Sequence, residues 1–223
     1  MKLSNDTLAI LRNFSAINHN LVVNEGNTLS TISEKRNIMA SASVAETFDT
    51  QFGIYDLNEF LSALSLVNDP SLEFSEESIR MAGTNGANVV YRTSVPSVLS
   101  YPQKSVNMPS TELKVTISKD IIDRLRKAGS VLGHDVVAFR GNNGKITANV
   151  ISISNPSSNT YEILLDESNE CTNTFDFQFL IENFKLLPGD YEINISSKLI
   201  SHWKSLSNPI EYWIALEKNS TYA

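Results

Sequence analysis

Reactive side chains are scarce in this chain of 223 residues. It has one cysteine, Cys171, so it cannot form an internal disulfide, and none of its three histidines stands at the spacing of a metal site. Neither glycine-rich turn, at 83–86 or at 141–144, is followed by the Lys-Ser or Lys-Thr pair of a phosphate-binding loop. The sequence therefore gives little support for an enzyme, a metal site or a bound cofactor.

Long hydrophobic runs are also missing. No apolar stretch approaches the roughly 20 residues that a membrane span needs, and the first residues become polar too early for a secretory signal. A single cysteine suits a reducing compartment. We therefore expect a cytoplasmic protein with no membrane contact.

The charge is acidic overall but unevenly distributed. A net charge of -7 argues against broad nucleic-acid binding, which usually comes with a basic domain. Five of the eighteen basic residues nevertheless fall within one short segment: Lys114, Lys119, Arg124, Arg126 and Lys127. The segment has two interpretations, a solvated helix face with charge pairs one turn apart or a strip that faces phosphates.

The chain contains an internal repeat. Residues 3–12 are echoed by residues 117–126, and in both copies a serine is followed two positions later by an aspartate and then by apolar residues at helical spacing. Two further matches follow in the same order, first Gly26 with Gly144 after Asn143, and then residues 55–60 with residues 179–184. Asn followed by Gly between apolar runs is a strong hairpin signal. The order predicts two duplicated domains.

Periodicity predicts an α+β fold in which each half has two short helices and a largely antiparallel sheet. The helices are expected after Ser4, after Ser118, at about 57–67 and at about 177–186. The strands are expected at 89–92, 136–140, 146–153, 160–165, 191–196 and 211–216.

Residues 93–112 read as an extended connector, because they hold three of the seven prolines and several serines. They also carry apolar residues that a fully solvated linker would avoid. We therefore expect an N-terminal domain over 1–92, a connector over 93–112 that lies on the protein surface, and a C-terminal domain over 113–223.

At this point the sequence resembles a known family, the sliding clamps of T-even-like bacteriophages, which are processivity factors of the phage replicative DNA polymerase. The resemblance runs from end to end and weakens at about 72–110 and 161–170. Its residues are Met1–Ser4, Asp6, Thr7, Leu11, Asn13, Phe14, Ile17, Asn18, Ile54–Asn58, Phe60, Leu61, Leu64–Asp69, Pro188–Tyr191, Tyr212, Ala215–Leu216, Glu217, Ser220 and Thr221.

The resemblance implies a DNA-clamp fold and a mechanism. Three protomers would close head to tail into a homotrimeric ring in the infected bacterial cell. Helices would line the hole, and duplex DNA would be encircled without its sequence being read. The ring would tether the phage DNA polymerase, and an ATP-dependent clamp loader would place it on DNA.

A sliding ring should attract phosphates through mobile basic side chains and make no base contacts. The candidates are Arg12, Lys119, Arg124, Arg126, Lys127 and Lys185. By angle around the helix, Lys119, Arg126 and Lys127 are expected to point furthest from the apolar stripe, with Arg124 nearer its edge. Arg12 and Arg126, which end the two repeat copies, would form a matched pair of phosphate contacts.

The resemblance also implies a groove in which polymerase and loader peptides insert apolar anchors, beside the connector and the last strand of the second domain. It maps to Val98, Leu99, Tyr101, Trp213 and Ala215. Trp213 has the alternative interpretation of an ordinary core residue.

Two other protein classes fit part of the sequence. An acidic, oligomeric phage structural protein of the tail or baseplate would not need basic residues on the matching helix face of both halves. A carbohydrate-binding β-sandwich is disfavoured by the four expected helices.

Overall fold

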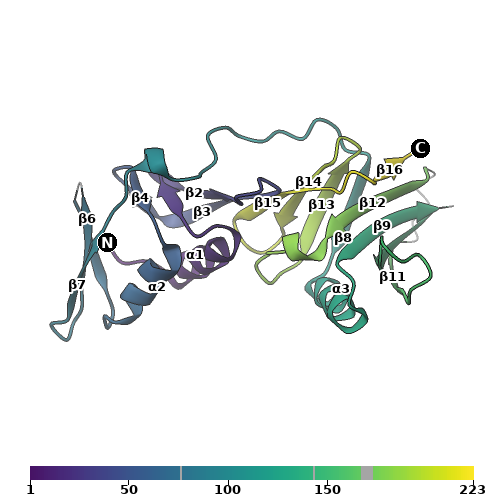
Figure 1. Cartoon of the computed structure of the whole chain (residues 1–223). Helices are drawn as coiled ribbons and strands as arrows, with labels where there is room; N and C mark the ends of the chain where they lie inside the picture. The colour runs from purple at the N-terminus through teal and green to yellow at the C-terminus, as the bar shows by residue number, and fades with distance from the viewer. Residues whose placement is uncertain (76, 143, 167–172) are drawn as a thin grey trace. The chain divides into compact units, whose positions relative to one another are not determined.

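The computed structural model describes residues 1–75, 77–142, 144–166 and 173–223 (Figure 1). Cys171 and Asn143 lie outside these residues. The chain divides into two compact units, Met1–Ser105 and Val106–Ala223, and the division falls inside the segment 93–112. No helix in the described ranges is long and apolar enough to cross a membrane.

The first unit contains two helices, a four-stranded antiparallel array and a separate three-stranded antiparallel sheet. Its elements are α1 (Asn5–Ile17), β1 (Leu21–Val23), β2 (Gly26–Ile32), β3 (Ile38–Phe48), β4 (Phe52–Ile54), α2 (Leu57–Ser65), β5 (Ser71–Phe74), β6 (Ser78–Ala82), β7 (Asn88–Arg92) and a 3₁₀ helix, Pro96–Val98. The strands of the array lie in the order β4-β1-β2-β3, and β6 is the middle strand of the small sheet. α1 contacts α2, β2 and β3, and buries Ile10, Leu11 and Phe14. The helix predicted after Ser4 is therefore confirmed.

The second unit packs one α-helix with two antiparallel arrays of strands. Its elements are β8 (Leu113–Ile117), α3 (Lys119–Leu132), β9 (Val136–Asn142), β10 (Lys145–Ile151), β11 (Tyr161–Asp166), β12 (Phe175–Leu180), a 3₁₀ helix (Ile181–Asn183), β13 (Tyr191–Ser196), β14 (Ile200–Ser205), β15 (Ile210–Ala215) and β16 (Thr221–Tyr222). One array has the order β11-β10-β9-β12-β16, and the other has the order β15-β14-β13-β8. Its core is aromatic, with Phe139, Phe179 and Phe184 packed around the fully buried Trp203.

The helix predicted at 177–186 is wrong. Residues 175–180 form strand β12, which lies between β9 and β16, and a single 3₁₀ turn follows. Phe175, Phe177 and Phe179 alternate along the chain and are all buried, which is the period of a strand rather than of a helix. Within the described residues the second unit therefore has one α-helix, and a 3₁₀ turn occupies the position that α2 occupies in the first unit.

Both turns marked by the repeat join antiparallel neighbours. Gly26 begins β2 with φ of 106°, and Gly144 precedes β10 with φ of 79°. Residues with side chains rarely adopt these positive φ values, so the glycines are required there.

The two repeated helices begin in the same way. Ser4 accepts a hydrogen bond from the Thr7 amide at 3.2 Å, and Ser118 accepts one from the Ile121 amide at 3.4 Å. A carboxylate from a distant segment completes each helix start. Glu46 of β3 accepts from the Ser4 amide and the Thr7 hydroxyl, and Asp190 accepts from the Lys119 amide at 2.8 Å. Negative charge at this end of a helix also interacts favourably with the helix dipole.

Replacing Glu46 with Gln is expected to destabilise the first unit. Burial raises the pKa of Glu46, but the hydrogen bonds from Thr7 and Ser4 outweigh it and hold the pKa below its ordinary value. A lowered folded-state pKa stabilises the protein above the unfolded-state pKa, and this stabilisation is lost as the pH falls through the folded-state pKa. Glu46→Gln should lower the free energy of unfolding by about 1–2 kcal/mol at pH 7. The difference in the free energy of unfolding between the variant and the wild type should shrink in acid.

Urea unfolding at pH 7 and at pH 3 checks this expectation. Glu25→Gln, at an exposed carboxylate in the β1–β2 turn, serves as the control and should change little at either pH. An equal loss in Glu46→Gln at both pH values would contradict the role assigned to the carboxylate charge.

Candidate nucleic-acid interface

α3 is an amphipathic helix whose outer face carries both charge signs. Ile122, Leu125 and Gly129 are buried. On the outer face, Lys119 Nζ lies 2.6 Å from Asp123 Oδ2, and Arg124 Nε lies 2.8 Å from Asp120 Oδ2. Each pair joins residues one helical turn apart, so the predicted charge pairs and the predicted basic face are both present on one surface.

The Lys119–Asp123 pair keeps both groups charged. The hydrogen bond from Lys119 lowers the pKa of Asp123, and the same bond raises the pKa of Lys119. Because both groups are solvent-exposed, the pair contributes little to stability. The carboxylate of Asp123 offsets the positive charge of Lys119 and leaves the exposed ammonium group in place.

The structure reverses the expected order of exposure on α3. The Arg126 side chain is 34% exposed, whereas the Arg124 side chain is 56% exposed. The Arg126 guanidinium donates to the main-chain carbonyl of Phe184 and also lies 3.7 Å from Asp123. The expectation that Arg126 points furthest from the apolar stripe is therefore wrong, because a long side chain bends toward an available carbonyl at the end of the 3₁₀ turn.

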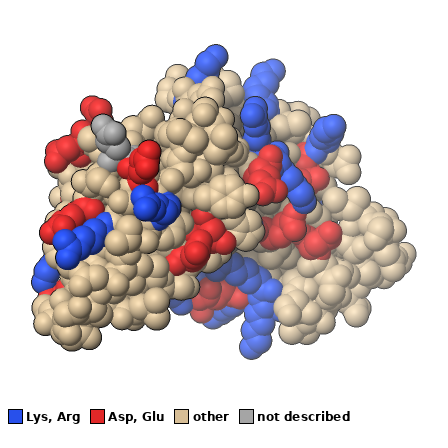
Figure 2. Space-filling view, turned by 60° about the vertical axis from the view of Figure 1, so that its left-hand side comes forward, with Lys and Arg blue, Asp and Glu red and all other residues tan. Residues whose placement is uncertain are grey.

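The other basic candidates differ in their surroundings. Lys127 on α3 and Arg12 on α1 are exposed, and neither has an ion-pair partner among the described residues. Lys185 is half-buried just after the 3₁₀ turn. Arg12 and Arg126 occupy equivalent repeat positions but are not a structurally matched pair, since one is exposed and the other is held by Phe184. On the face shown in Figure 2, acidic and basic groups are interspersed.

The connector is fixed to the first unit through Leu99. The Leu99 side chain is buried, and a Cβ added at Gly53 of β4 would lie 2.6 Å from its Cδ1. The Ser94 amide donates to the Gly53 carbonyl at 2.8 Å, and the Asn18 side chain donates to the Ser100 carbonyl at 3.1 Å. Leu99 is thus an anchor of the connector.

Val98 and Tyr101 are the connector candidates that remain accessible. Val98 is exposed and Tyr101 is half-buried, on either side of the anchored Leu99.

Trp213 lies on the outer face of β15 and not in the core. The strand alternates, with Ile210, Tyr212 and Ile214 buried, while Trp213 and Ala215 point to the other side and are half-buried. The Trp213 ring stacks on His202 of β14 with ring centroids 5.0 Å apart. His202 Nε2 in turn lies 2.8 Å from Glu211 Oε2.

Sequence reasoning missed His202 as the neighbour of Trp213. The pairing of β14 with β15, which places the two residues opposite each other, could have indicated it.

Comparisons with known proteins decide the family. Residues 4–80 match the family model described as DNA polymerase processivity factor, and residues 111–218 match the model described as gp45 sliding clamp, C terminal. The sliding clamp of Vibrio phage KVP40 is 31% identical to this chain, covering 97% of the chain and 99% of that protein. The chain belongs to the sliding-clamp family. The sliding clamps of Escherichia phage RB69 and Enterobacteria phage T4 are each 30% identical and cover 100% of the chain.

Solved structures confirm the clamp fold. The chain matches a PCNA2–PCNA3 complex from Sulfolobus tokodaii with a TM-score of 0.66 at 16% identity, over 97% of this chain and 99% of the other. It matches PCNA of A. fulgidus, solved with the C-terminal region of FEN-1, with a TM-score of 0.69 at 11% identity, over 96% of each chain. Identities this low show the fold alone.

Membership of the clamp family confirms several expectations. The chain is a polymerase accessory protein and not an enzyme. Sliding clamps act in DNA replication with DNA and a polymerase as partners. The interpretations as a tail or baseplate protein and as a carbohydrate-binding sandwich are set aside.

Arg126→Ala is expected to weaken folding of the clamp. It removes the donor to the Phe184 carbonyl, and the loss should lower the free energy of unfolding by about 1–2 kcal/mol. Lys127→Ala, one position along the same helix and exposed, should stay within about 0.5 kcal/mol of wild type. Urea unfolding monitored by the fluorescence of Trp203 and Trp213 measures both variants. Equal stability of the two variants would show that Arg126 contributes nothing through Phe184.

Proposed function

We propose that this chain is the sliding clamp of a bacteriophage: three copies close around duplex DNA in the cytoplasm of the infected bacterium and tether the phage replicative polymerase. An ATP-dependent loader opens the ring and places it on DNA. The observation that carries the proposal is similarity to phage sliding clamps along essentially the whole length of both chains. Each chain would contribute two domains, 1–92 and 113–223, joined by the connector 93–112.

Contact with DNA is proposed through the exposed basic groups of α1 and α3. Arg12 and Lys127 are the principal phosphate contacts, because both are exposed and neither is engaged in an ion pair among the described residues. Lys119, Arg124 and Lys185 add weaker contacts, and Arg126 positions α3 through Phe184. Phosphate contacts of this kind hold the duplex without fixing a sequence position.

The carboxylates that pair with basic residues on α3 are compatible with sliding along DNA. A basic group that already has an exposed carboxylate partner can exchange between that carboxylate and a passing phosphate, since both are solvated and similar in energy. Lys119 and Arg124 each have such a partner one turn away. Contacts of this type would be short-lived, so the ring would not stall.

Two free strand edges support the proposal of a ring. In the described residues β7 ends the small sheet of the first unit, and β11 ends the five-stranded sheet of the second unit. Each edge exposes a large apolar side chain, Val90 at 58% and Leu164 at 44%. An exposed apolar edge strand favours pairing with another strand.

Pairing of β7 in one copy with β11 in the next gives a complementary register. If the strands pair antiparallel with Val90 opposite Leu164, Arg92 falls opposite Glu162, because each step along one strand is a step back along the other. Both charged residues are exposed. The contact joins different surfaces of the two copies, so it is heterologous and can close into a ring.

Polymerase and loader peptides are proposed to bind apolar groups on two surfaces. Val98 and Tyr101 would contribute from the connector, and Trp213 and Ala215 from the outer face of β15. Accessible aromatic and aliphatic groups of this kind are typical anchors for a peptide. Leu99 would contribute indirectly, by holding the connector on β4.

Reversing the charge of the two principal contacts should impair the clamp. Arg12→Glu with Lys127→Glu is expected to shorten polymerase products and to speed loss of the ring from circular DNA as salt is raised. The slope of log affinity against log salt should fall by about one for each phosphate contact removed. Lys218→Glu, at an exposed position outside both helices, is the control for Arg12→Glu and Lys127→Glu made singly, because each of these variants reverses one basic charge. Unchanged product length in the double variant would remove Arg12 and Lys127 from the interface.

A charge swap tests the proposed ring contact. Glu162→Arg should place two cations opposite each other and weaken the trimer at least several-fold, whereas Arg92→Glu combined with Glu162→Arg should restore it. Sedimentation equilibrium measures the trimer fraction across micromolar concentrations. Failure of the swap to restore assembly would overturn the register, and a wild-type monomer under these conditions would overturn the ring.

A further inference from the structure

The three most exposed large apolar side chains among the described residues lie at the ends of α2 and α3. Val131, in the last turn of α3, is 74% exposed, Leu66 at the end of α2 is 72% exposed, and Tyr55, just before α2, is 70% exposed. α2 contacts β7, and α3 contacts β11 (Figure 1), so both helices lie beside the strands with free edges. Apolar residues scattered singly on a surface are ordinary, but apolar helix ends beside apolar strand edges mark a contact surface.

α2 runs in the opposite direction to β7 and covers one face of it. The Tyr91 side chain is buried and its hydroxyl donates to the Asp56 carbonyl at 3.1 Å, so α2 begins beside the last residues of β7. The Thr84 amide donates to the Asn68 carbonyl at 3.2 Å, so α2 ends beside the turn that precedes β7. Side chains alternate along a strand, so Val90 faces away from α2.

α3 likewise runs in the opposite direction to β11. It ends beside the segment that precedes this strand, where His134 Nε2 lies 2.7 Å from the Asn159 carbonyl oxygen. Gly129 faces the 3₁₀ turn that follows β12, since a Cβ added there would lie 2.5 Å from Ile181 Cδ1. β12 and β11 lie on opposite sides of β9 and β10, and Val131, two residues after Gly129, points roughly the opposite way around the helix. Val131 is therefore on the flank of α3 that is turned toward β11.

Pairing the two free edges brings these helices together. Directly opposite residues share one face of a sheet, so the proposed register, which sets the exposed apolar residues of β7 and β11 opposite each other, places both helices on the other face. Each helix opposes the direction of its own strand and the strands pair antiparallel, so α2 of one copy and α3 of the next also run antiparallel. The start of α2 then meets the end of α3, which puts Tyr55 beside Val131. The end of α2 meets the start of α3, which puts Leu66 beside the half-buried Ile121.

Charge complementarity points to the same partner. α2 carries one charged residue, Glu59, which is exposed between Tyr55 and Leu66. In the antiparallel arrangement Glu59 falls beside the middle of α3, where Arg124 is exposed. The Arg124 guanidinium has several N–H donors, so it can bond Glu59 as well as Asp120, its partner on α3. A second α2 in the same place would instead set two glutamates against each other.

We propose that α2 of one copy packs against α3 of the next as a second layer of the contact between copies, with Tyr55 on Val131 and Leu66 on Ile121. This helix layer rests on the proposed ring, and it adds a contact that does not depend on hydrogen bonds between the strands. A second copy of this chain is the occupant that fits, because the apolar ends and the central charges of the two helices match in one antiparallel order.

Cross-linking between copies tests the helix layer. In a Cys171→Ser background, Tyr55→Cys protein and Val131→Cys protein are mixed, allowed to exchange copies and treated with a short bismaleimide. Sedimentation first establishes that both variants assemble. A denaturing gel is expected to show covalent dimers in the mixture and none with either variant alone, because the contact joins different surfaces of the two copies.

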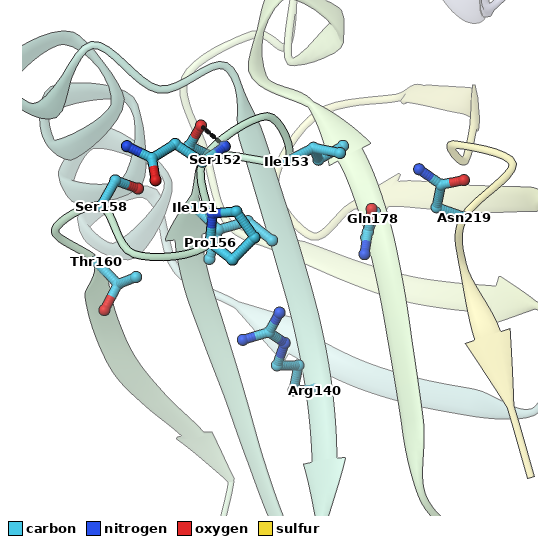
Figure 3. Close-up of a pocket in the computed structure, with 10 residues that line it drawn as sticks. Arg140, Ile151, Ser152, Ile153, Pro156, Ser158, Thr160, Gln178 and Asn219 are labelled. Carbon is cyan, nitrogen blue, oxygen red and sulfur yellow. Dashed lines mark hydrogen bonds between the residues drawn. The ribbon is translucent and has the colours of Figure 1, made fainter.

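The matched control lies on the other side of the second unit's sheet. Ile153 is exposed, and Figure 3 shows it on the side of its loop toward Gln178 of β12, away from Thr160, the residue before β11. Ile153→Cys protein mixed with Tyr55→Cys protein should therefore give no covalent dimers.

Charged substitutions test the helix layer through assembly. Val131→Asp and Leu66→Asp should each weaken the trimer about tenfold or more, the loss expected for one buried aliphatic contact. Ile153→Asp, which places the same charge at an exposed aliphatic residue outside the layer, should assemble like the wild type. A trimer that gives no cross-links, or Val131→Asp protein that assembles as strongly as the wild type, would overturn the helix layer and leave the ring standing. A wild-type protein that stays monomeric would overturn the ring and the layer with it.

Discussion

Within each unit, the orientation of the long helix depends on how that helix begins. At each start a serine caps the helix, and a carboxylate from a distant segment fixes the same end, Glu46 for α1 and Asp190 for α3. A helix held at one end by a group from a distant segment has little freedom to rotate about its axis. The outward direction of Arg12 on α1 and of Lys127 on α3 follows from this constraint, as does the inward direction of Phe14 and Leu125.

Features that depend on residues close together in the sequence were predicted correctly. The serine caps, the glycine turns and the alternation of β15 were all readable from the sequence, because each depends on residues a few positions apart. The strand at 175–180 was misread, since Phe177, Ile181 and Phe184 also fit a helical period and the choice depends on the sheet that surrounds Phe177. Glu46 could not be found from the sequence, because its partners Ser4 and Thr7 lie some forty residues away and meet it only in the fold.

At the candidate interface, too, the sequence did not reveal contacts that form only in the fold. The sequence predicted which basic residues lie on α3, but it did not predict the directions of their side chains. Arg126 is drawn to a carbonyl of a segment that the sequence suggested was helical, while Arg124 finds an exposed acid on its own helix. The reach of a long side chain depends on acceptors supplied by tertiary structure, so angle around a helix is a weak guide for arginine.

The exposed edges of β7 and β11 have a consequence for the protein before it assembles. In a free chain each of these strands has one unpaired edge. A newly made copy could therefore pair through the wrong edge of another copy. Two copies of β7 would bring their Arg92 side chains to one seam, and two copies of β11 would do the same with Glu162, so like edges repel while unlike edges attract. In the proposed ring, the charge on each edge would give assembly a direction, because it favours the contact between unlike edges over the contact between two like edges.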